Sequence, residues 1–322
     1  MLMLILSSAL AITCPSYTCT SNSINLYKGQ CIYASKSTLY LSPCKDSLIP
    51  YCSPSASNTT CIPNPQKSEK STAWPGEKCS KDSTCAYGMC YKSRCNSQNF
   101  AMSCNIDDQC NPGLYCNLNT NTCAFLIQPL ASGCTKSTDC VISSGCNFGV
   151  CIPYFNLTSG KELQTCQNNQ NYLCQTQVCG TLNGKNVCGS EVTSFNGTCK
   201  SNSDCVSSFN KFLGYTIQSE CKCSLEKAAA GYCTKLPGDQ EYVDYIDDLK
   251  DWINSDEAKM CNTVRRFTDA CLMIYGDGES ILQKKMFIEL WPQIRNNEDC
   301  TKEIFNTKYW DLKDSQSSYP IG

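Results

Sequence analysis

Cysteine is the residue type whose number and spacing in this chain could do chemistry. The chain has 30 cysteines among 322 residues, and this density, about 9%, is near the level that marks a disulfide scaffold. Paired cysteines form disulfides, which persist in oxidising compartments, whereas free thiolates bind metals or act as nucleophiles. The Cys-x-x-Cys spacing of zinc ribbons and thioredoxin-like sites does not occur. The cysteines therefore predict disulfide bonds, and metal storage is the main alternative use for them.

The sequence contains no histidine, which excludes the commonest forms of acid–base and nucleophilic catalysis. Ser-His-Asp and Cys-His arrangements and histidine metal ligands are ruled out. Paired carboxylates are the remaining route, but Asp247, Asp248 and Asp251 fit an exposed helix face. Calcium loops, phosphate loops and basic stripes for nucleic acid are also missing. We therefore expect no enzyme activity, no cofactor, no metal and no nucleic-acid partner.

The first residues are typical of a secretory signal peptide. Leu2 to Ile12 is an uncharged apolar run containing Ala9-Leu10-Ala11, a small-residue pattern that signal peptidase accepts. We expect a signal peptide over residues 1–11, with cleavage near Ala11. A membrane anchor is the alternative, but about 11 apolar residues are too few to cross a bilayer, which needs roughly 20. No later apolar stretch approaches that length, so no membrane span is expected.

Three asparagines begin Asn-x-Ser/Thr sequons, which in a secreted chain are candidate glycosylation sites on surface loops. They are Asn58, Asn156 and Asn196. Together with the cysteines and the apolar leader, they predict an extracellular or secretory-pathway location.

Cysteine spacing divides the rest of the chain into four regions. Residues 12–61 form an N-terminal cysteine-rich module, and residues 62–76 form a proline-rich linker that should be extended and exposed. Residues 77–235 are predicted to form tandem cysteine-rich repeats made of short β-hairpins and loops. Residues 236–322 are predicted to form a small all-α domain.

The tandem repeats are five units of similar spacing, which is the mark of an array. Five residues separate the first two cysteines in four units, and an acid (Asp108, Asp139 or Asp204) lies within two positions before the second cysteine in three. Each four-cysteine unit allows three pairings, and the sequence does not choose among them. The cysteines are Cys79, Cys85, Cys90, Cys95; Cys104, Cys110, Cys116, Cys123; Cys134, Cys140, Cys146, Cys151; Cys166, Cys174, Cys179, Cys188; and Cys199, Cys205, Cys221, Cys223, Cys233.

The helical region shows apolar residues at helical spacing over residues 242–253, 260–274 and 281–291. Ser255 and the acids after it predict the start of the second helix, Pro292 the end of the third, and a fourth short helix would follow Asn297. On one continuous helix Cys261 and Cys271 would lie about 15 Å apart. That is beyond the reach of a disulfide, so they are predicted not to pair with each other. At least one tail cysteine (Cys261, Cys271 or Cys300) should instead join the last unit, docking the helices on it covalently.

Charge is unevenly distributed along the chain. Residues 1–235 carry 17 Lys/Arg and 12 Asp/Glu, a net charge of +5, whereas residues 236–322 carry 10 and 17, a net charge of −7. The charges of the tail could simply solvate helix faces. The alternative is that the acidic tail attracts a partner or packs against the array.

The segment Cys104-Asn-Ile-Asp-Asp-Gln-Cys110-Asn-Pro-Gly-Leu-Tyr-Cys116 resembles the N-terminal cysteine-rich motif of the Dickkopf family. The openings at Cys134–Cys140 and Cys199–Cys205 are similar to the same motif. The resemblance implies a secreted disulfide module. Dickkopf proteins antagonise Wnt signalling mainly through a second, colipase-like domain, and the helical tail does not match that domain. The resemblance therefore implies the module and not the pathway.

Taken together, these features predict a secreted, non-enzymatic binding protein whose partner is another extracellular or surface protein, or itself. The repeats would act as a semi-rigid stalk, with loops or the helical tail making the contact. A structural component of a surface coat, extracellular matrix or secretory granule is the alternative, and an inhibitor of a secreted hydrolase is a third. Self-association would favour the structural role, and a saturable partner would favour the binding protein.

Overall fold

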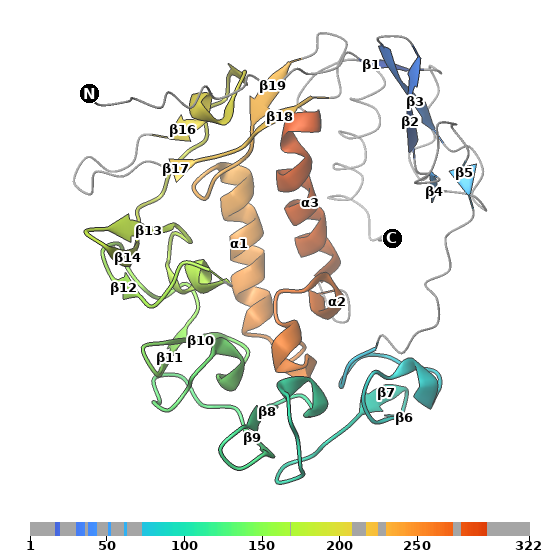
Figure 1. Cartoon of the computed structure of the whole chain (residues 1–322), viewed down its shortest axis with the longest axis vertical. Helices are drawn as coiled ribbons and strands as arrows, with labels where there is room; N and C mark the ends of the chain where they lie inside the picture. Colours follow the sequence, from blue (N-terminus) through green and yellow to red (C-terminus); the bar gives the residue numbers. More distant parts are fainter. Residues whose placement is uncertain are drawn as a thin grey trace, which may run out of the picture.

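Five small cysteine-stapled units follow one another in a curved row beside three helices (Figure 1). The computed structural model describes residues 73–167, 169–207, 217–224, 230–272 and 278–294, and the backbone of five short strands between residues 17 and 62. We call residues 73–96, 97–126, 127–154, 155–191 and 192–237 units 1 to 5. Ala11, Asn58 and Cys300 lie outside the described residues.

The strands are short and pair mainly as antiparallel hairpins. Those before unit 1 are β1 (Tyr17–Cys19), β2 (Gln30–Ser35), β3 (Thr38–Pro43), β4 (Tyr51–Cys52) and β5 (Cys61–Ile62). Units 1 to 3 contain β6 (Met89–Tyr91), β7 (Arg94–Asn96), β8 (Leu114–Asn117), β9 (Thr122–Phe125), β10 (Ser144–Asn147) and β11 (Val150–Pro153). Units 4 and 5 contain β12 (Glu162–Leu163), β13 (Cys179–Leu182), β14 (Lys185–Cys188), β15 (Thr198–Cys199), β16 (Val206–Ser207), β17 (Ile217–Gln218), β18 (Cys221–Cys223) and β19 (Gly231–Cys233).

The helices follow unit 5, and one short 3₁₀ helix precedes the hairpin of each unit. The α-helices are α1 (Gln240–Ile253), α2 (Asp269–Leu272) and α3 (Gly278–Ile294). The 3₁₀ helices are η1 (Asp82–Thr84), η2 (Asp107–Gln109), η3 (Ser137–Asp139), η4 (Gln170–Leu173), η5 (Asn202–Asp204), η6 (Ala258–Met260) and η7 (Thr263–Arg265).

All five units share one disulfide pattern, in which the first cysteine bonds to the third and the second to the last. The last cysteine is the fourth in units 1 to 4 and the fifth, Cys233, in unit 5, where Cys223 is additional. The third and last cysteines face each other across the hairpin, as Cys116 and Cys123 do in unit 2. The bonds are Cys79–Cys90, Cys85–Cys95, Cys104–Cys116, Cys110–Cys123, Cys134–Cys146, Cys140–Cys151, Cys166–Cys179, Cys174–Cys188, Cys199–Cys221 and Cys205–Cys233. Because units this small bury little apolar surface, these buried disulfides form the centres of units 2, 3 and 5.

A polar side chain fixes the 3₁₀ turn to the hairpin in four units. It lies three positions before the second cysteine and accepts a hydrogen bond from the backbone N–H of the third cysteine. The residues are Asp82, Asp107, Ser137 and Asn202, with distances of 2.8, 2.9, 3.1 and 2.8 Å. Such a bond to a buried backbone amide contributes about 1 kcal/mol, and it replaces the apolar packing that a larger domain would use.

The residue directly before the second cysteine has a different role. Gln109, Asp139 and Asp204 accept hydrogen bonds from backbone N–H groups at the start of their own 3₁₀ turn. The N–H groups of Lys200 and Ser201 hold the pKa of Asp204 below its usual value. Two of the three acids noted in the sequence, Asp139 and Asp204, are therefore turn caps, and in unit 2 this role belongs to Gln109 and not to Asp108.

The first predicted helix is confirmed and the second is wrong. Helix α1 spans Gln240–Ile253 and buries Tyr245, Ile246, Leu249, Trp252 and Ile253. Residues 255–272 form instead the 3₁₀ helices η6 and η7 and the four-residue α2. Phe267 has a φ of 62°, which no right-handed helix accommodates. The third helix, α3, includes Pro292 and ends at Ile294.

The break between η6 and α2 also corrects the prediction for the tail cysteines. Cys261 and Cys271 are bonded to each other, with Cα atoms 5.7 Å apart. The 15 Å estimate assumed a continuous helix, and the chain turns back on itself instead. The linker prediction needs correction at its end as well, because Pro75 and Gly76 are buried and Ala73 pairs with Cys85.

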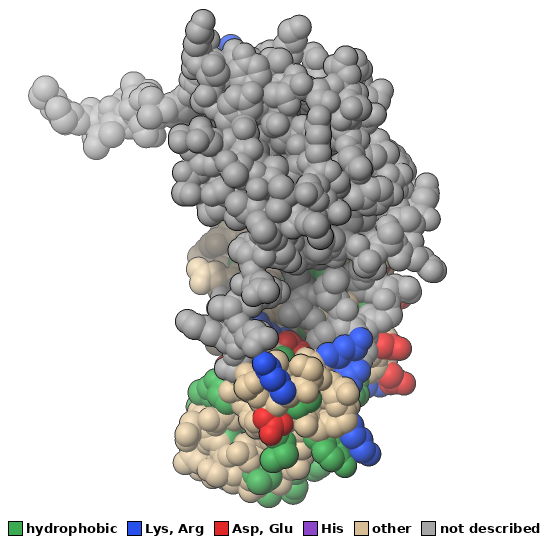
Figure 2. All heavy atoms as spheres, turned by 90° about the vertical axis from the view of Figure 1, so that its right-hand side faces the viewer, with side chains coloured by type: hydrophobic (Ala, Val, Ile, Leu, Met, Phe, Trp, Pro, Cys, Tyr) green, Lys and Arg blue, Asp and Glu red, His purple; other side chains and the backbone are tan. Residues whose placement is uncertain are grey.

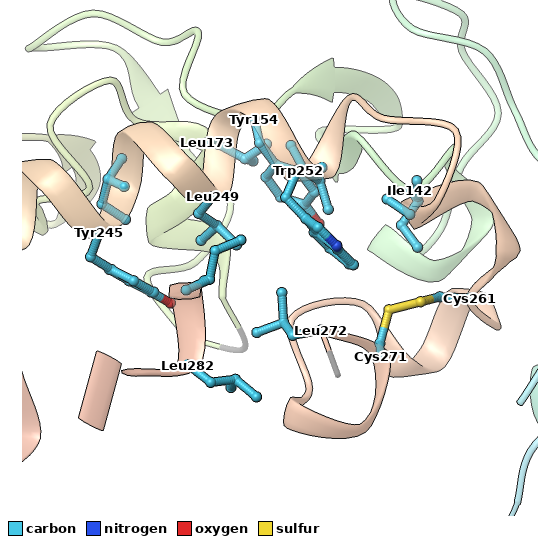
Figure 3. Close-up of a cluster of buried hydrophobic side chains, with 14 of the residues drawn as sticks. Ile142, Tyr154, Leu173, Tyr245, Leu249, Trp252, Cys261, Cys271, Leu272 and Leu282 are labelled. Carbon is cyan, nitrogen blue, oxygen red and sulfur yellow. A yellow bond between two sulfur atoms is a disulfide. The ribbon is translucent and has the colours of Figure 1, made fainter. Parts of the chain in front are cut away.

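The described helices do not make a separate core of their own. Leu249, Trp252 and Leu272 from the helices pack in one cluster with Ile142 of unit 3 and Leu173 of unit 4 (Figure 3). Tyr154 and Leu163 belong to the same cluster. A separate all-α domain is therefore not confirmed, and units 3 and 4 supply six of the eighteen buried residues of the core that buries α1. The array is not an extended stalk, because it curves around the helices (Figure 1).

Cys223 provides a test of how the tail is attached. It is disulfide-bonded, Cys221 is bonded to Cys199, and the partner of Cys223 lies outside the residues whose side chains the structure describes. Cys261 and Cys271 are bonded to each other. If the six cysteines of residues 12–61 also pair among themselves, Cys300 is the remaining cysteine that can bond to Cys223. Lys235 Nζ lies 4.0 Å from the ring centroid of Trp291, which places the end of α3 beside unit 5.

We therefore expect non-reducing peptide mapping to find Cys223 linked to Cys300. A Cys223 peptide linked to the N-terminal module would contradict this expectation, and so would a free thiol at Cys300.

Candidate functional site

The loop closed by the Cys261–Cys271 disulfide, which we call the clasp (residues 261–271), holds units 1 to 3 in place. It lies between the end of α1 and α3 and faces the second cysteines of units 2 and 3. Its polar side chains donate to backbone carbonyls of the array, and each of these carbonyls belongs to a turn that the disulfides already fix. The clasp therefore joins preformed units.

Asn262 and Thr263 make the contacts to the 3₁₀ turns of units 2 and 3. Asn262 is 1% exposed; its Nδ2 donates to the carbonyl of Cys110 at 2.9 Å, and its Oδ1 accepts from Val264 N at 3.0 Å. Thr263 is fully buried, and its hydroxyl donates to the carbonyl of Thr138 at 2.6 Å. Both side chains satisfy buried carbonyls that would otherwise cost about 1–3 kcal/mol each.

Arg266 is the centre of the clasp. Its guanidinium is buried and donates to the carbonyls of Cys140, Val141 and Ser144 in unit 3 and to the hydroxyl of Tyr154. The Nε atom donates to the carbonyl of Thr263 at 3.0 Å within the clasp. A buried charge is tolerated when its donors are paired, and the planar fork of arginine suits several carbonyls at once. Arg266 is therefore a structural cross-link between the tail and unit 3.

Unit 1 is attached to the clasp by its neighbour, Arg265. The guanidinium carbon of Arg265 lies 3.9 Å from the ring centroid of Trp74, and its Nε lies 3.8 Å from Glu77 Oε1. Gly76 has a φ of 93°, and a Cβ there would lie 2.3 Å from the carbonyl oxygen of Met260. Only glycine allows this approach of unit 1 to the tail.

Asp107 connects units 2 and 3 directly. It is 4% exposed, and its Oδ2 accepts from the Thr138 hydroxyl at 2.6 Å and forms an ion pair of 2.6 Å with Lys136. Its Oδ1 accepts from Cys116 N within unit 2. This aspartate was missed in the sequence, although a polar residue three positions before the second cysteine recurs through the array and was a visible signal.

Asp108 lies beside this link and responds to pH. Burial and the neighbouring Asp107 carboxylate raise the pKa of Asp108 above its ordinary 3.8. A carboxyl group with a raised pKa holds its proton more tightly in the folded state, so the protein gains stability below pH 3.8 and loses it as the pH rises through the folded pKa.

We therefore expect Asp108→Asn to raise the free energy of unfolding at pH 7, by less than about 1 kcal/mol because the group is partly solvated. The gain should vanish at about pH 3, where the wild-type group is protonated as well. Thermal unfolding at the two pH values measures this difference. An equal effect at both, or a loss at pH 7, would contradict the assignment.

The surface of the units that the clasp holds is rich in exposed apolar side chains. Among the described residues, nine of the twelve exposed large hydrophobic side chains lie between residues 89 and 148. They are Met89, Tyr91, Phe100, Met102, Ile106, Leu118, Phe125, Leu130 and Phe148. Figure 2 shows hydrophobic side chains at the lower end of the molecule, where the first units lie, with Lys/Arg and Asp/Glu side chains among them.

Units 2 and 3 carry very little charge under these side chains. Residues 97–154 contain four charged residues, Asp107, Asp108, Lys136 and Asp139, in a chain that is 17% charged. Asp107 and Asp139 are buried, and Lys136 is paired with Asp107. We call the exposed surface of units 2 and 3, with Phe100, Phe125, Leu130 and Phe148, the neutral face. Depletion of charge with enrichment of aromatic residues and methionine is the composition of protein interface centres.

Two aromatic side chains of unit 2 are stacked on each other although both are exposed. The rings of Phe100 and Phe125 stack with centroids 4.6 Å apart and an interplanar angle of 18°. Phe100 is 56% and Phe125 is 66% exposed. The Ala101 amide donates to the carbonyl of Cys123, so the two segments are fixed by the disulfide-bonded hairpin. Such rigid exposed aromatics lose little conformational entropy on binding.

The predicted site residues fall into three groups. The repeat cysteines and Cys261 and Cys271 are disulfide-bonded, so the groups of three neighbouring cysteines in units 1, 2, 3 and 5 offer no thiolate to a metal. Asn156 and Asn196 are exposed near the start of units 4 and 5, before the first cysteine of each, which leaves them open to glycosylation. Asp247 and Asp251 are exposed on α1, and Asp248 pairs with Lys284 at 2.6 Å.

The buried tyrosines complete the set of titratable groups near the clasp. Burial, and then the proximity of Tyr172, raises the pKa of both Tyr242 and Tyr245, so both stay neutral. Phe267 packs its ring 4.7 Å from that of Tyr172 and 4.9 Å from that of Tyr154. These side chains anchor the clasp to units 3 and 4.

Comparison with known proteins adds no name to this arrangement. No protein-family model matches the chain, and neither a curated protein nor a solved structure matches it. Among the described residues, no helix has the length and apolar composition to cross a membrane. The extensive disulfide bonding fits an extracellular or secreted protein.

Proposed function

We propose that this chain is a secreted, non-enzymatic binding protein that contacts its partner through the neutral face. In this proposal residues 1–11 are removed as a signal peptide, and the disulfide-bonded units and the clasp keep the face rigid outside the cell. The observation that carries the proposal is the clustering of exposed apolar side chains on units 2 and 3, where exposed charge is nearly absent. We infer that these side chains form one apolar patch, and large exposed apolar patches mark interaction sites.

The test uses full-length protein that has been expressed through a secretory pathway. Its binding to the cells and to the secreted proteins of its source organism is measured as a function of its concentration. We expect saturable binding that changes little between about 0.1 and 0.5 M salt, because screening acts on charges and not on apolar contacts. The double variant Phe100→Ser/Phe125→Ser should lose most of the binding.

Phe195→Ser provides the matched control. Phe195 is 52% exposed but belongs to unit 5 and not to the neutral face of units 2 and 3, so its replacement should leave the binding intact. Binding that does not saturate, that falls steeply with salt, or that survives the double variant would contradict the proposed function.

A structural role in a coat, matrix or granule remains the second candidate. The same neutral face supports it, because surfaces that carry little charge can also meet copies of themselves.

A further inference from the structure

Leu130 occupies a backbone position that leucine does not favour. In units 1 to 4 one residue donates its amide to the carbonyl of the fourth cysteine and has a positive φ. These residues are Gly76, Ala101, Leu130 and Gly160, with φ of 93°, 64°, 65° and 84°. A bulky residue in this left-handed region is uncommon and strained. Glycine, found in two of the four units, avoids the strain.

Phe148 presents the same mismatch in the hairpin turn of unit 3. Two-residue turns with positive φ at both positions connect β6 to β7, β10 to β11 and β13 to β14. Their first residues are Lys92, Phe148 and Asn183, with φ of 48°, 47° and 50°. Asn-Gly, as at 183–184, is the preferred pair for such a turn. Unit 3 has phenylalanine where asparagine would fit with less strain.

Burial does not explain either residue. Leu130 is 70% exposed and Phe148 is 57% exposed. They lie on adjoining segments of one unit, because Leu130 N donates to the carbonyl of Cys151 and Gly133 N to that of Gly149. Strained, exposed apolar residues that add nothing to the core are characteristic of functional sites.

The charge distribution indicates what docks there. A face that meets a second copy of itself brings like charges together unless it is uncharged. The neutral face meets this condition, since Asp108 and the paired Lys136 are its remaining accessible charges, whereas residues 236–322 carry a net charge of −7. A symmetric contact also matches apolar surface with apolar surface, as two-fold interfaces require.

We propose that a second copy of this chain docks on the neutral face, with Leu130 and Phe148 as contact residues. This inference rests on the proposed function, since it names the partner of the same surface. It predicts that replacing Leu130 and Phe148 by glycine and asparagine, which their backbone conformations favour, weakens dimerisation without lowering the stability of the monomer.

Sedimentation velocity of the full-length, deglycosylated protein tests the inference over about 1–100 µM. We expect a concentration-dependent dimer for the wild type and at least a tenfold weaker one for Leu130→Gly/Phe148→Asn. Phe195→Ser should dimerise like the wild type. At a protein concentration where both proteins are monomeric, the thermal midpoint of Leu130→Gly/Phe148→Asn should equal or exceed that of the wild type, because the substitutions relieve backbone strain.

Three results would overturn the inference: a wild type that stays monomeric throughout, a variant that dimerises equally well, and a variant with a lowered midpoint. If the wild type is monomeric but Phe100→Ser/Phe125→Ser still abolishes saturable binding to secreted proteins, self-docking fails and the proposed function stands. If the dimer forms and no other secreted protein binds, self-docking stands and the neutral face serves assembly.

Discussion

Replacing Arg266 with alanine should lower the free energy of unfolding by about 2–4 kcal/mol. The substitution leaves the buried carbonyls of Cys140, Val141 and Ser144 without this donor, and an unsatisfied buried acceptor costs about 1–3 kcal/mol. The loss of the buried charge itself offsets part of this cost. Denaturation with the disulfides intact measures the change.

The neighbouring Arg265 supplies the matched control. Its side chain is 28% exposed and makes a ring contact with Trp74 and a long ion pair with Glu77. Arg265→Ala should therefore cost only about 1 kcal/mol. Arg266→Lys keeps the charge but loses the planar fork, so it should behave more like the alanine variant than like the wild type. Equal effects of Arg265→Ala and Arg266→Ala would show that the clasp does not depend on the buried guanidinium.

Removing the clasp disulfide is the second large expected effect. The double variant Cys261→Ala/Cys271→Ala should lose about 2–3 kcal/mol, the amount expected for opening a loop of this length. It should also accelerate amide hydrogen exchange in units 1 to 3, because Asn262, Thr263 and Arg266 lose their fixed positions opposite the array.

Cys79→Ala/Cys90→Ala is the control for this variant. The two bonds close similar loops, with sequence separations of 11 for Cys79–Cys90 and 10 for Cys261–Cys271. Opening the loop in unit 1 should raise exchange in unit 1 alone. Exchange that stays local to residues 261–271 in the clasp variant would contradict the proposed coupling between the clasp and the array.

The units could be predicted from the sequence because their information is local. Cysteine spacing marks the hairpins, and the disulfides then fix them with little help from distant residues. Helix α1 was predictable for the same reason, since Tyr245, Leu249 and Trp252 repeat at helical spacing. The pairing of cysteines within a unit was not predictable, because four cysteines permit three arrangements.

The clasp was not predictable because it depends on distant contacts. Val264 and Phe267 follow helical spacing, yet Asn262 and Arg266 donate to carbonyls of residues more than 100 positions earlier in the chain. The Cys261–Cys271 bond forms only once the helix is broken. The shared core was hidden for a related reason, since Ile142, Tyr154 and Leu173 show no periodicity within the array.

The neutral face was partly visible in the sequence. The scarcity of charge over residues 97–154 can be read directly, but which apolar side chains remain exposed cannot. Leu114 is buried whereas Phe125, opposite it in the hairpin, is exposed. Leu130 and Phe148 stand out because of their positive φ angles, and these angles could not be predicted from the sequence.

Disulfide mapping of the secreted protein, digested at acidic pH without reduction, tests most directly the claim that the array and the tail form one fixed scaffold. The structure predicts first-to-third and second-to-last bonds in all five units and a separate bond between Cys261 and Cys271. Finding these peptides would support a rigid scaffold that presents the neutral face. Cys261 or Cys271 recovered as a free thiol, or bonded to a unit of the array, would contradict the clasp and the placement of the units that depends on it.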